Sequence, residues 1–310
     1  MLRFVLRRLA QTVPVLLAAV TIAFLLIRLA PGGPFTEEKN FPEESMRQLR
    51  RHYGLDDPIP VQYVRYLGNL LRGDLGPSFK YPNRTVNQII GEFFPVSLEL
   101  GAWALLYSLL VGLAAGIIAA LRPNTGLDYA SMALAMIGVC VPSMVLGPLL
   151  VLCFALGLGW FNAAGWNTAA DRVLPALTLG AAYTAYIARL CRGRMLEVLP
   201  QDYIRTAHAK GVPPGRIITH HALKNALLPV VSFLGPAVAG LITGSFVVET
   251  VFHIPGLGKM FVTAAFNRDY SLILGLVVFY AGLVVLANTC ADILLAVLNP
   301  KLRQRIGLGT

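Results

Sequence analysis

The chain has 310 residues, of which 56% are hydrophobic and 14% are charged, and its mean hydropathy is +0.64. These values lie outside the range of ordinary soluble domains, so we interpret the chain as an integral membrane protein. Its formal net charge is +10. That excess is explained by membrane topology, as the distribution of charges below indicates, so no nucleic-acid partner is inferred.

About six apolar runs predict the transmembrane segments of an all-α fold. A helix needs about 20 apolar residues to cross ~30 Å of hydrocarbon, and six runs of about that length or longer are present. The predicted spans are residues 9–30, 97–121, 129–158, 173–190, 229–248 and 272–298. The chain then divides into three parts: a first transmembrane helix at residues 1–30, a helical extracytoplasmic cap at 31–95, and a five-helix core at 96–310.

The first span follows Arg7 and Arg8, an arrangement that also occurs in secretory signals. Its apolar run from Val13 to Leu29 is long, and residues 30–34, Ala-Pro-Gly-Gly-Pro, make a poor cleavage site. We therefore expect a retained first helix.

The cap between the first two spans is predicted to be folded. Residues 43–53 and 61–71 both carry apolar side chains at helical spacing, and a turn-forming segment at residues 54–60 separates them. Eight acidic residues balance eight basic ones between residues 31 and 95. This balance favours a small folded unit over a disordered arm.

Two of the spans have unusual sequences. The third is too long for one straight helix, and Pro142 near its middle predicts a kink. The fourth carries polar residues such as Thr178 and Thr184 among small ones. This composition is typical of a helix buried against protein and not of one that faces lipid.

Lysine and arginine residues are distributed unequally between the two sides of the predicted bundle. With both termini on one side, the segments on that side hold 14 basic residues and three acidic ones, whereas the other side holds 12 and 11. Positively charged segments stay in the cytoplasm, so we expect both termini to be cytoplasmic.

Residues 197–228 form a basic cytoplasmic loop between the fourth and fifth spans. Asp202 can cap a short helix, Gly211 and Pro213 then force a turn, and a second helix is expected from Gly215 to Leu227. The loop is either a charged segment that only sets topology or a docking element for a soluble partner. Its shaped turn favours docking.

Small and weakly polar residues give the fifth span the composition of a helix that lines a pathway. The candidates for pathway lining are Ser232, Gly235, Gly240, Thr243 and Ser245. Plain helix packing is the alternative, since small residues four apart, such as Gly112 with Gly116, allow close approach of helices.

Glu99 and Asp292 are carboxylates within or near predicted spans, where a charge is costly and is a functional hypothesis by default. Each lies close enough to a span end to reach the interface or cap a neighbouring helix. That interpretation is favoured over a polar path or a contact with a partner subunit.

No motif for catalysis, nucleotide or metal is recognised. Gly256-Leu-Gly-Lys259 lacks the first glycine and the final Ser or Thr of a phosphate-binding loop. The four cysteines have no metal-binding spacing, and His208, His220 and His221 lack a carboxylate at ligand spacing. We expect no enzyme activity, cofactor or metal in this chain.

Ordered motifs lie along nearly the whole chain. They are Arg205-Thr-Ala-x-x-x-Gly211 and residues 29–34, 73–78, 221–229, 248–252, 255–258 and 268–270. Together they resemble the peptide and nickel family of ATP-binding-cassette importer permeases, most like its oligopeptide B subunits, and Arg205–Gly211 occupies the place of that family's Glu-Ala-Ala-x-x-x-Gly loop. Arg205 and Thr206 depart from the general Glu and Ala, a change that is ordinary in the peptide branch.

The resemblance implies a permease core with a coupling helix, paired with a homologous C-type permease subunit in the bacterial inner membrane. Two cytoplasmic subunits would bind ATP and Mg²⁺, and an extracytoplasmic peptide-binding protein would deliver substrate. Residues implied to couple to the ATPases are Asp202, Tyr203, Arg205, Thr206, Ala207, Lys210, Gly211 and Pro213. Candidates for docking the binding protein are Glu249, Pro255, Gly256, Gly258, Arg268 and Asp269. For Gly256 and Gly258, a turn without partner contact is the alternative.

The substrate stays open at this stage. The resemblance favours oligopeptides moved by alternating access, and dipeptides, nickel, glutathione or murein peptides are alternatives in the same family. An ion-coupled secondary transporter is disfavoured because no internal repeat is visible. A structural membrane scaffold is the third possibility.

Overall fold

The computed structural model describes residues 2–29, 44, 47, 48, 51, 53–243 and 246–298. Over these residues the chain is almost entirely helical, and the only β-pairing is an isolated bridge between Pro77 and Thr85. Five helical segments are long and apolar enough to cross a membrane, and a sharply bent pair of helices provides a sixth. The predicted all-α membrane fold is confirmed.

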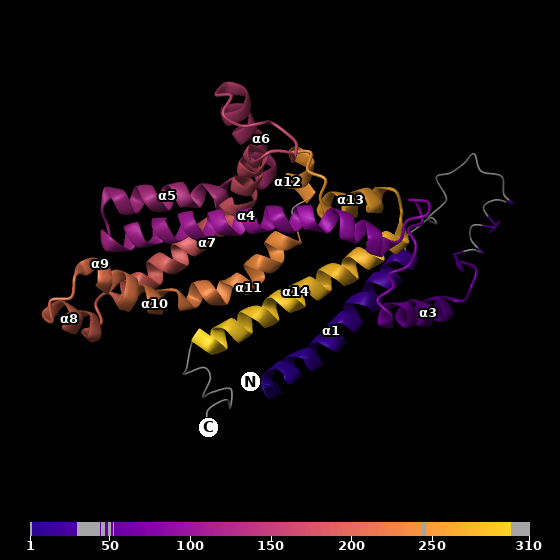
Figure 1. The fold of residues 1–310 in the computed structure, drawn as a ribbon, viewed down its shortest axis with the longest axis horizontal. Coiled ribbons are helices and arrows are strands. Elements are labelled where there is room, and N and C mark those ends of the chain that lie inside the picture. The colour runs from indigo at the N-terminus through magenta and orange to yellow at the C-terminus, as the bar shows by residue number, and fades with distance from the viewer. Residues whose placement is uncertain are drawn as a thin grey trace.

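The spanning helices are arranged in two groups (Figure 1). The helix α4 (Val86–Leu121) packs against α7 (Val173–Val198) and α5 (Gly126–Cys140). On the other side, α11 (Leu228–Ile242) packs against α14 (Tyr270–Leu298), and α14 also packs against α1 (Leu2–Leu29). Contacts of α11 with both α4 and α7 join the groups.

The predicted kink in the third span is confirmed. The chain bends by 112° between α5 and the helix α6 (Ser143–Leu150), which continues as the π-helical segment η1 (Val151–Gly157). The bend lies at Val141 and Pro142. Val141 is extended, with φ −105° and ψ 118°, because the proline ring excludes the helical conformation at the preceding residue.

The helix α4 begins eleven residues before the predicted start of the second span. Thr85 Oγ1 accepts a hydrogen bond from the Gln88 amide at 3.2 Å, and Gln88 Oε1 accepts one from the Thr85 amide at 3.0 Å, which forms a capping box. Thirty-six residues extend ~54 Å, well beyond ~30 Å of hydrocarbon. The boundary predicted at residue 95 falls inside α4, so one helix continues from the predicted cap into the predicted core.

Glycines bring α4 and α7 into backbone contact. A Cβ atom at Gly116 would lie 2.6 Å from the Ala188 carbonyl oxygen, and one at Gly180 would lie 2.7 Å from the Ala104 carbonyl oxygen. Gly112 is equally close to α7. The prediction that the fourth span is buried against protein is confirmed, because more than half of its residues are buried.

Three short helices lie near the end of the bundle at which α4 begins. They are α3 (Ile59–Leu71), α12 (Phe246–Val251) and α13 (Leu257–Phe266). The helix α3 confirms the predicted second cap helix. Most of the predicted helix at residues 43–53 lies outside the described residues. 

Candidate functional site

The loop between α7 and α11 is the most distinctive element at the opposite end of the bundle. It consists of α8 (Asp202–Ala209), a turn, α9 (Pro214–Arg216), the π-helical η3 (Ile217–Ala222) and α10 (Leu223–Ala226). The predicted order of helix, turn and helix is confirmed. One detail differs: the N-cap residue of α8 is Gln201, and Asp202 is the first helical residue.

The turn after α8 is a Schellman motif. Gly211 has φ +74°, its amide donates to the His208 carbonyl at 2.9 Å, and the Val212 amide donates to the Ala207 carbonyl at 3.1 Å. A left-handed residue is required at this position, which explains why glycine is used. The turn reverses the chain before Pro213 and Pro214 start α9.

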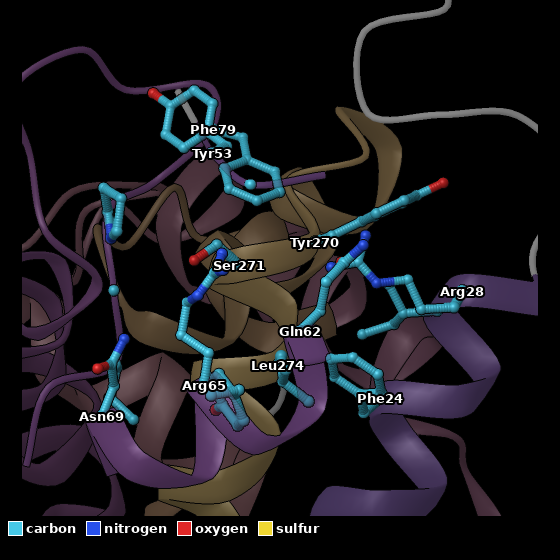
Figure 2. A pocket seen from close by; sticks show the side chains of 16 residues that line it. Phe24, Arg28, Tyr53, Gln62, Arg65, Asn69, Phe79, Tyr270, Ser271 and Leu274 are labelled. Carbon is cyan, nitrogen blue, oxygen red and sulfur yellow. The ribbon is translucent and has the colours of Figure 1, made fainter. Parts of the chain in front are cut away.

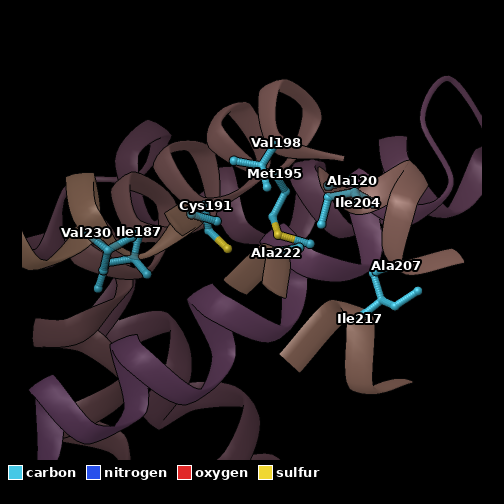
Figure 3. Packing of buried hydrophobic residues seen from close by; sticks show 11 residues of the cluster. Ala120, Ile187, Cys191, Met195, Val198, Ile204, Ala207, Ile217, Ala222 and Val230 are labelled. Carbon is cyan, nitrogen blue, oxygen red and sulfur yellow. The ribbon is translucent and has the colours of Figure 1, made fainter. Parts of the chain in front are cut away.

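The underside of this loop is tied to the transmembrane helices by an apolar cluster (Figure 3). Ile204 and Ile217 are 2% and 1% exposed and belong to the same cluster as Met195 and Val198 of α7. The Asn225 side-chain amide also donates to the Tyr203 hydroxyl at 2.8 Å, which links α8 to α10. The loop is therefore held by α7 and by its own second half.

Seven of the eight predicted coupling residues lie on the exposed face of the loop. These are Asp202, Tyr203, Arg205, Thr206, Lys210, Gly211 and Pro213. Ala207 is the exception, because it is only 7% exposed and belongs to the apolar cluster. The Ala207 side chain therefore packs inside the protein, which corrects its assignment as a direct contact with a partner.

An ion pair that the sequence analysis missed lies near this loop. Both side-chain nitrogens Nε and Nη2 of Arg192 donate to the Asp128 carboxylate at 2.7 Å, and the Asn124 amide donates to the same carboxylate at 2.9 Å. The Asp128 side chain is 2% exposed. The pair joins the first turn of α5 to α7. The only signal in the sequence was the acidic residue Asp128 in the first turn of a helix. The fold was needed to show that Arg192 lies opposite it.

Two of the five predicted pathway residues of the fifth span, Gly235 and Gly240, lie at close helix contacts. A Cβ atom at Gly235 would lie 2.7 Å from Ala291 of α14, and one at Gly240 would lie 2.3 Å from the Tyr183 hydroxyl of α7. Ser232 is exposed, and its hydroxyl donates to the Leu228 carbonyl.

Two further pathway candidates give less information. The Thr243 hydroxyl donates to the Gly240 carbonyl at 3.1 Å within the same helix, and Ser245 lies outside the described residues. Packing explains the glycines without a pathway, and pathway lining by Ser232 and Thr243 stays a prediction.

At the other end of the bundle, Glu249 is a fully buried carboxylate. It accepts hydrogen bonds from the Ser97 hydroxyl and the Lys259 amide, both at 2.8 Å. A Cβ atom at Gly256 would lie 2.4 Å from its carboxylate carbon, so the backbone can close over Glu249 only at a glycine. Glu249, Gly256 and Gly258 therefore form an internal tie, and Glu249 cannot touch a docked protein in this conformation.

Asp269 forms a second internal tie. Its carboxylate is fully buried and accepts hydrogen bonds from the Ser78 hydroxyl and from the amides of Phe79 and Leu272, the last two at 3.1 Å. This contact joins two matched motifs, residues 73–78 and 268–270. Asp269 thus shapes the surface and does not itself present a docking group, whereas Pro255 is exposed.

Glu99 is held by an ion pair at the same end. Its carboxylate accepts from Arg172 Nε at 2.8 Å and from Trp166 Nε1 at 3.1 Å, and the Arg172 guanidinium lies 4.9 Å from the Trp166 ring centroid. The contact fixes the loop before α7 against α4. This geometry supports the interfacial interpretation of Glu99.

The fold and these contacts define a class: a multi-pass membrane protein with a rigidly mounted loop at one end of its bundle and internally tied loops at the other. The chain matches the family of binding-protein-dependent transport system inner membrane components over residues 112–304, and its N-terminal component over residues 1–101. The chain therefore belongs to this family and is a multi-pass inner membrane protein.

Relatives cover almost the entire chain. The oligopeptide transport system permease protein OppB of Salmonella typhimurium is 50% identical over 305 residues, which is 98% of this chain and 100% of the relative. The dipeptide transport system permease protein DppB of Bacillus subtilis is 44% identical, with 98% of each chain covered. A solved structure of the MetNI methionine ABC transporter, in an inward-facing conformation, matches with a TM-score of 0.55 at 18% identity, covering 68% of this chain and 97% of that one. This last similarity shows a shared fold.

Proposed function

We propose that this chain is the permease subunit of an ATP-driven importer that moves oligopeptides across the bacterial inner membrane. Family membership and the 50% identity to OppB proteins support the transport role and the substrate class. The mechanism rests on one observation, which is the packing of residues 197–228 against the transmembrane helices. An exposed loop whose underside is packed on α7 can transmit a displacement to the bundle.

In this proposal the chain works with four other subunits. It pairs with a homologous C-type permease subunit, two cytoplasmic subunits bind ATP and Mg²⁺, and an extracytoplasmic protein delivers peptide. This chain supplies no catalytic residue. ATP-driven closure of the ATPase pair displaces α8. The apolar cluster transmits this displacement to α7 and α11. The pathway then opens to the other side of the membrane.

The orientation follows from the same proposal. Residues 197–228 face the cytoplasm in this proposal. Both termini then lie on the cytoplasmic side, and the first turns of α4 and α14, near Glu249 and Asp269, lie on the outer side. The binding protein then docks on the surface that these two carboxylates hold in shape. Pro255 and Phe266 are exposed there, and the Phe266 side chain is 79% exposed, as an aromatic docking anchor would be.

The test is peptide uptake into proteoliposomes that contain the whole complex with its binding protein, with ATP on the ATPase side. Gly211→Val forces a β-branched residue into a left-handed conformation, at a cost of about 1–2 kcal/mol or more. We expect at least a tenfold loss of uptake with the subunits still assembled. Gly215→Ala is the matched control, because a Cβ at Gly215 meets nothing within 4 Å.

Two results would contradict the proposal. Uptake driven by a pH gradient without ATP would indicate a secondary transporter. Unchanged uptake by a well-assembled Gly211→Val complex would remove the loop from coupling. Competition with dipeptides, nickel, glutathione and murein peptides in the same assay distinguishes the possible substrates, and inhibition by one of these but not by oligopeptides would correct the substrate class.

A further inference from the structure

A cavity of about 250 Å³ lies between α1, α3 and the first turn of α14 (Figure 2). Since a water molecule occupies ~30 Å³ in the liquid, the cavity can hold a polar group of several heavy atoms. Its polar lining includes Arg28, Gln62, Arg65, Tyr66 and Asn69. Neither the coupling loop nor the buried contacts of Glu249 and Asp269 give this cavity a function.

Gln62 and Tyr66 line the cavity, and each carries a buried polar atom, Gln62 Oε1 and the Tyr66 hydroxyl, that has no hydrogen-bond partner among the described residues. Gln62 is 9% exposed, and its side-chain nitrogen donates to the carbonyls of Leu55 at 3.1 Å and Asp57 at 2.7 Å. These two bonds fix the amide, so its oxygen is left as an acceptor. A buried acceptor without a donor is costly, which points to a ligand that carries an N–H or O–H group.

Two arginines, Arg28 and Arg65, line the same cavity. The Arg28 guanidinium stacks 5.3 Å from the Phe24 ring centroid and has no carboxylate partner in the described part of the chain. Arg65 is already paired with Asp57, at 2.5 Å. Figure 2 shows Arg28 extending from α1 toward the cavity. A ligand that suits the site therefore combines an anionic group for Arg28 with a hydrogen-bond donor for Gln62.

The helix α3 has one apolar stripe directed away from the protein. Val61, Val64 and Leu71 are 47%, 67% and 89% exposed, and with Gly68 they follow the spacing of one helical face. The opposite face packs on α1, where the Tyr63 hydroxyl lies 2.6 Å from Thr21 Oγ1.

The position of this contact gives the depth of α3. Thr21 lies within the apolar span Thr12–Leu29 of α1, eight residues and therefore ~12 Å from its end at Leu29. Phe24, which contacts the rings of Tyr63 and Tyr66, lies in the same span. A helix that contacts the membrane-embedded part of α1 and turns an apolar stripe outward has the features of an interfacial amphipathic helix.

We propose that the cavity binds the headgroup of a phospholipid from the adjoining leaflet, which is the outer leaflet in the orientation given above. The phosphate lies against Arg28 and accepts a hydrogen bond from the Tyr66 hydroxyl, and an ammonium or hydroxyl group of the headgroup donates to Gln62 Oε1. The stripe of Val61, Val64 and Leu71 lies against the acyl chains. Phosphatidylethanolamine and phosphatidylglycerol fit this chemistry, whereas phosphatidylcholine has no headgroup donor.

Lipid binding can be measured by native mass spectrometry of the intact transporter complex, delipidated and then titrated with dioleoyl lipids. We expect phosphatidylethanolamine and phosphatidylglycerol to bind about tenfold more tightly than phosphatidylcholine, as the loss of one hydrogen bond to a buried acceptor implies. Equal binding of all three lipids would overturn the proposed recognition by Gln62.

Variants assign the binding to this cavity. Arg28→Gln and Tyr66→Phe are each expected to weaken phosphatidylethanolamine binding by fivefold or more, and Arg28→Lys is expected to restore part of it. Tyr66→Phe removes only a hydroxyl group without a partner among the described residues, so the fold is preserved. Arg72→Gln is the matched control, since Arg72 is exposed at the end of α3 and outside the cavity.

The source of the headgroup is tested with soluble glycerophosphoethanolamine, which lacks acyl chains. Under the proposal it binds at least a hundredfold more weakly than the lipid. Binding as tight as that of the lipid would show a site for a free phosphate ester. Lipid binding that is unchanged by both Arg28→Gln and Tyr66→Phe would place the bound lipid elsewhere, and either result would overturn the proposal.

Discussion

At the scale of single residues, the buried carboxylates of Glu249 and Asp269 fix the loops at the end of the bundle where α4 begins. A buried charge is tolerated only where donors surround it. Glu249 receives a hydroxyl and a backbone amide, and Asp269 receives a hydroxyl and several amides. Each carboxylate thereby fixes the start of a helix, α13 and α14 respectively, against a segment more than 150 residues earlier.

Glu249→Ala should destabilise the complex by about 3 kcal/mol. The substitution leaves the Ser97 hydroxyl and the Lys259 amide without an acceptor in a buried site. The unfolding midpoint of the purified complex measures the effect. Thr250→Ala is the control, because Thr250 is exposed beside Glu249, and it should change stability by less than about 0.5 kcal/mol.

The ion pair of Asp128 and Arg192 should show strong energetic coupling in a double-mutant cycle. Asp128→Asn and Arg192→Gln are each expected to lower the unfolding midpoint, and the double variant is expected to be less destabilised than the sum of both. Strong coupling is expected because Arg192 donates two hydrogen bonds to Asp128 and because the Asp128 carboxylate is almost fully buried.

The control cycle uses Arg194 and Glu197. This pair also has a short contact, at 2.5 Å, but its side chains are 41% and 63% exposed, so solvent screens the interaction. Coupling in the Asp128 pair that is no larger than in this exposed pair would contradict a structural role for Asp128.

At the scale of elements, the seam between α4 and α7 depends on glycine. Gly116→Leu should separate the two helices, since even its Cβ would come within 2.6 Å of a carbonyl oxygen of α7. We expect loss of folded complex, measured as the monodisperse fraction in size-exclusion chromatography.

Gly193→Ala in α7 is the matched control for this seam. A Cβ at Gly193 meets nothing within 4 Å, and alanine is the better helix former by up to about 1 kcal/mol. This variant should be as stable as the parent or slightly more stable. A well-folded Gly116→Leu complex would show that the two helices can be spaced further apart without loss of the fold.

At the scale of the whole molecule, the proposed orientation can be tested with single cysteines on a background in which the four native cysteines are replaced by alanine. Asn267→Cys and Arg205→Cys both place the thiol at exposed positions. A membrane-impermeant maleimide should label Asn267→Cys in intact spheroplasts and Arg205→Cys only after permeabilisation. The reverse pattern would place the termini outside.

Much of the architecture was predictable from local sequence, because transfer of a helix into hydrocarbon depends mainly on its own composition. The apolar runs predicted the spans, Pro142 predicted the bend, and Gly211 with Pro213 predicted the turn of the coupling loop. The start of α4 was missed because residues 86–96 include Asn87, Gln88, Glu92 and Pro95 and are therefore less apolar than a membrane span, and the capping pair Thr85 and Gln88 has no apolar signature.

The candidate site was predictable in part. The exposed turn of residues 197–228 was predictable from its glycine, prolines and charges, but the coupling and docking residues were implied by the family resemblance and the pathway residues were assigned from composition. Glu249 and Gly256 carry the same sequence signal whether they face a partner or each other. Only packing shows that Glu249 is covered by the backbone at Gly256.

The sequence by itself determined the order and approximate extent of the apolar spans, the membrane class and the family, because hydropathy, turn residues and ordered motifs are local properties that sum along the chain. The tertiary structure alone decided that Ser78 meets Asp269, that Arg192 meets Asp128 and that α3 lies against the apolar span of α1. Such contacts join segments far apart in sequence, and they depend on how closely whole helices approach one another.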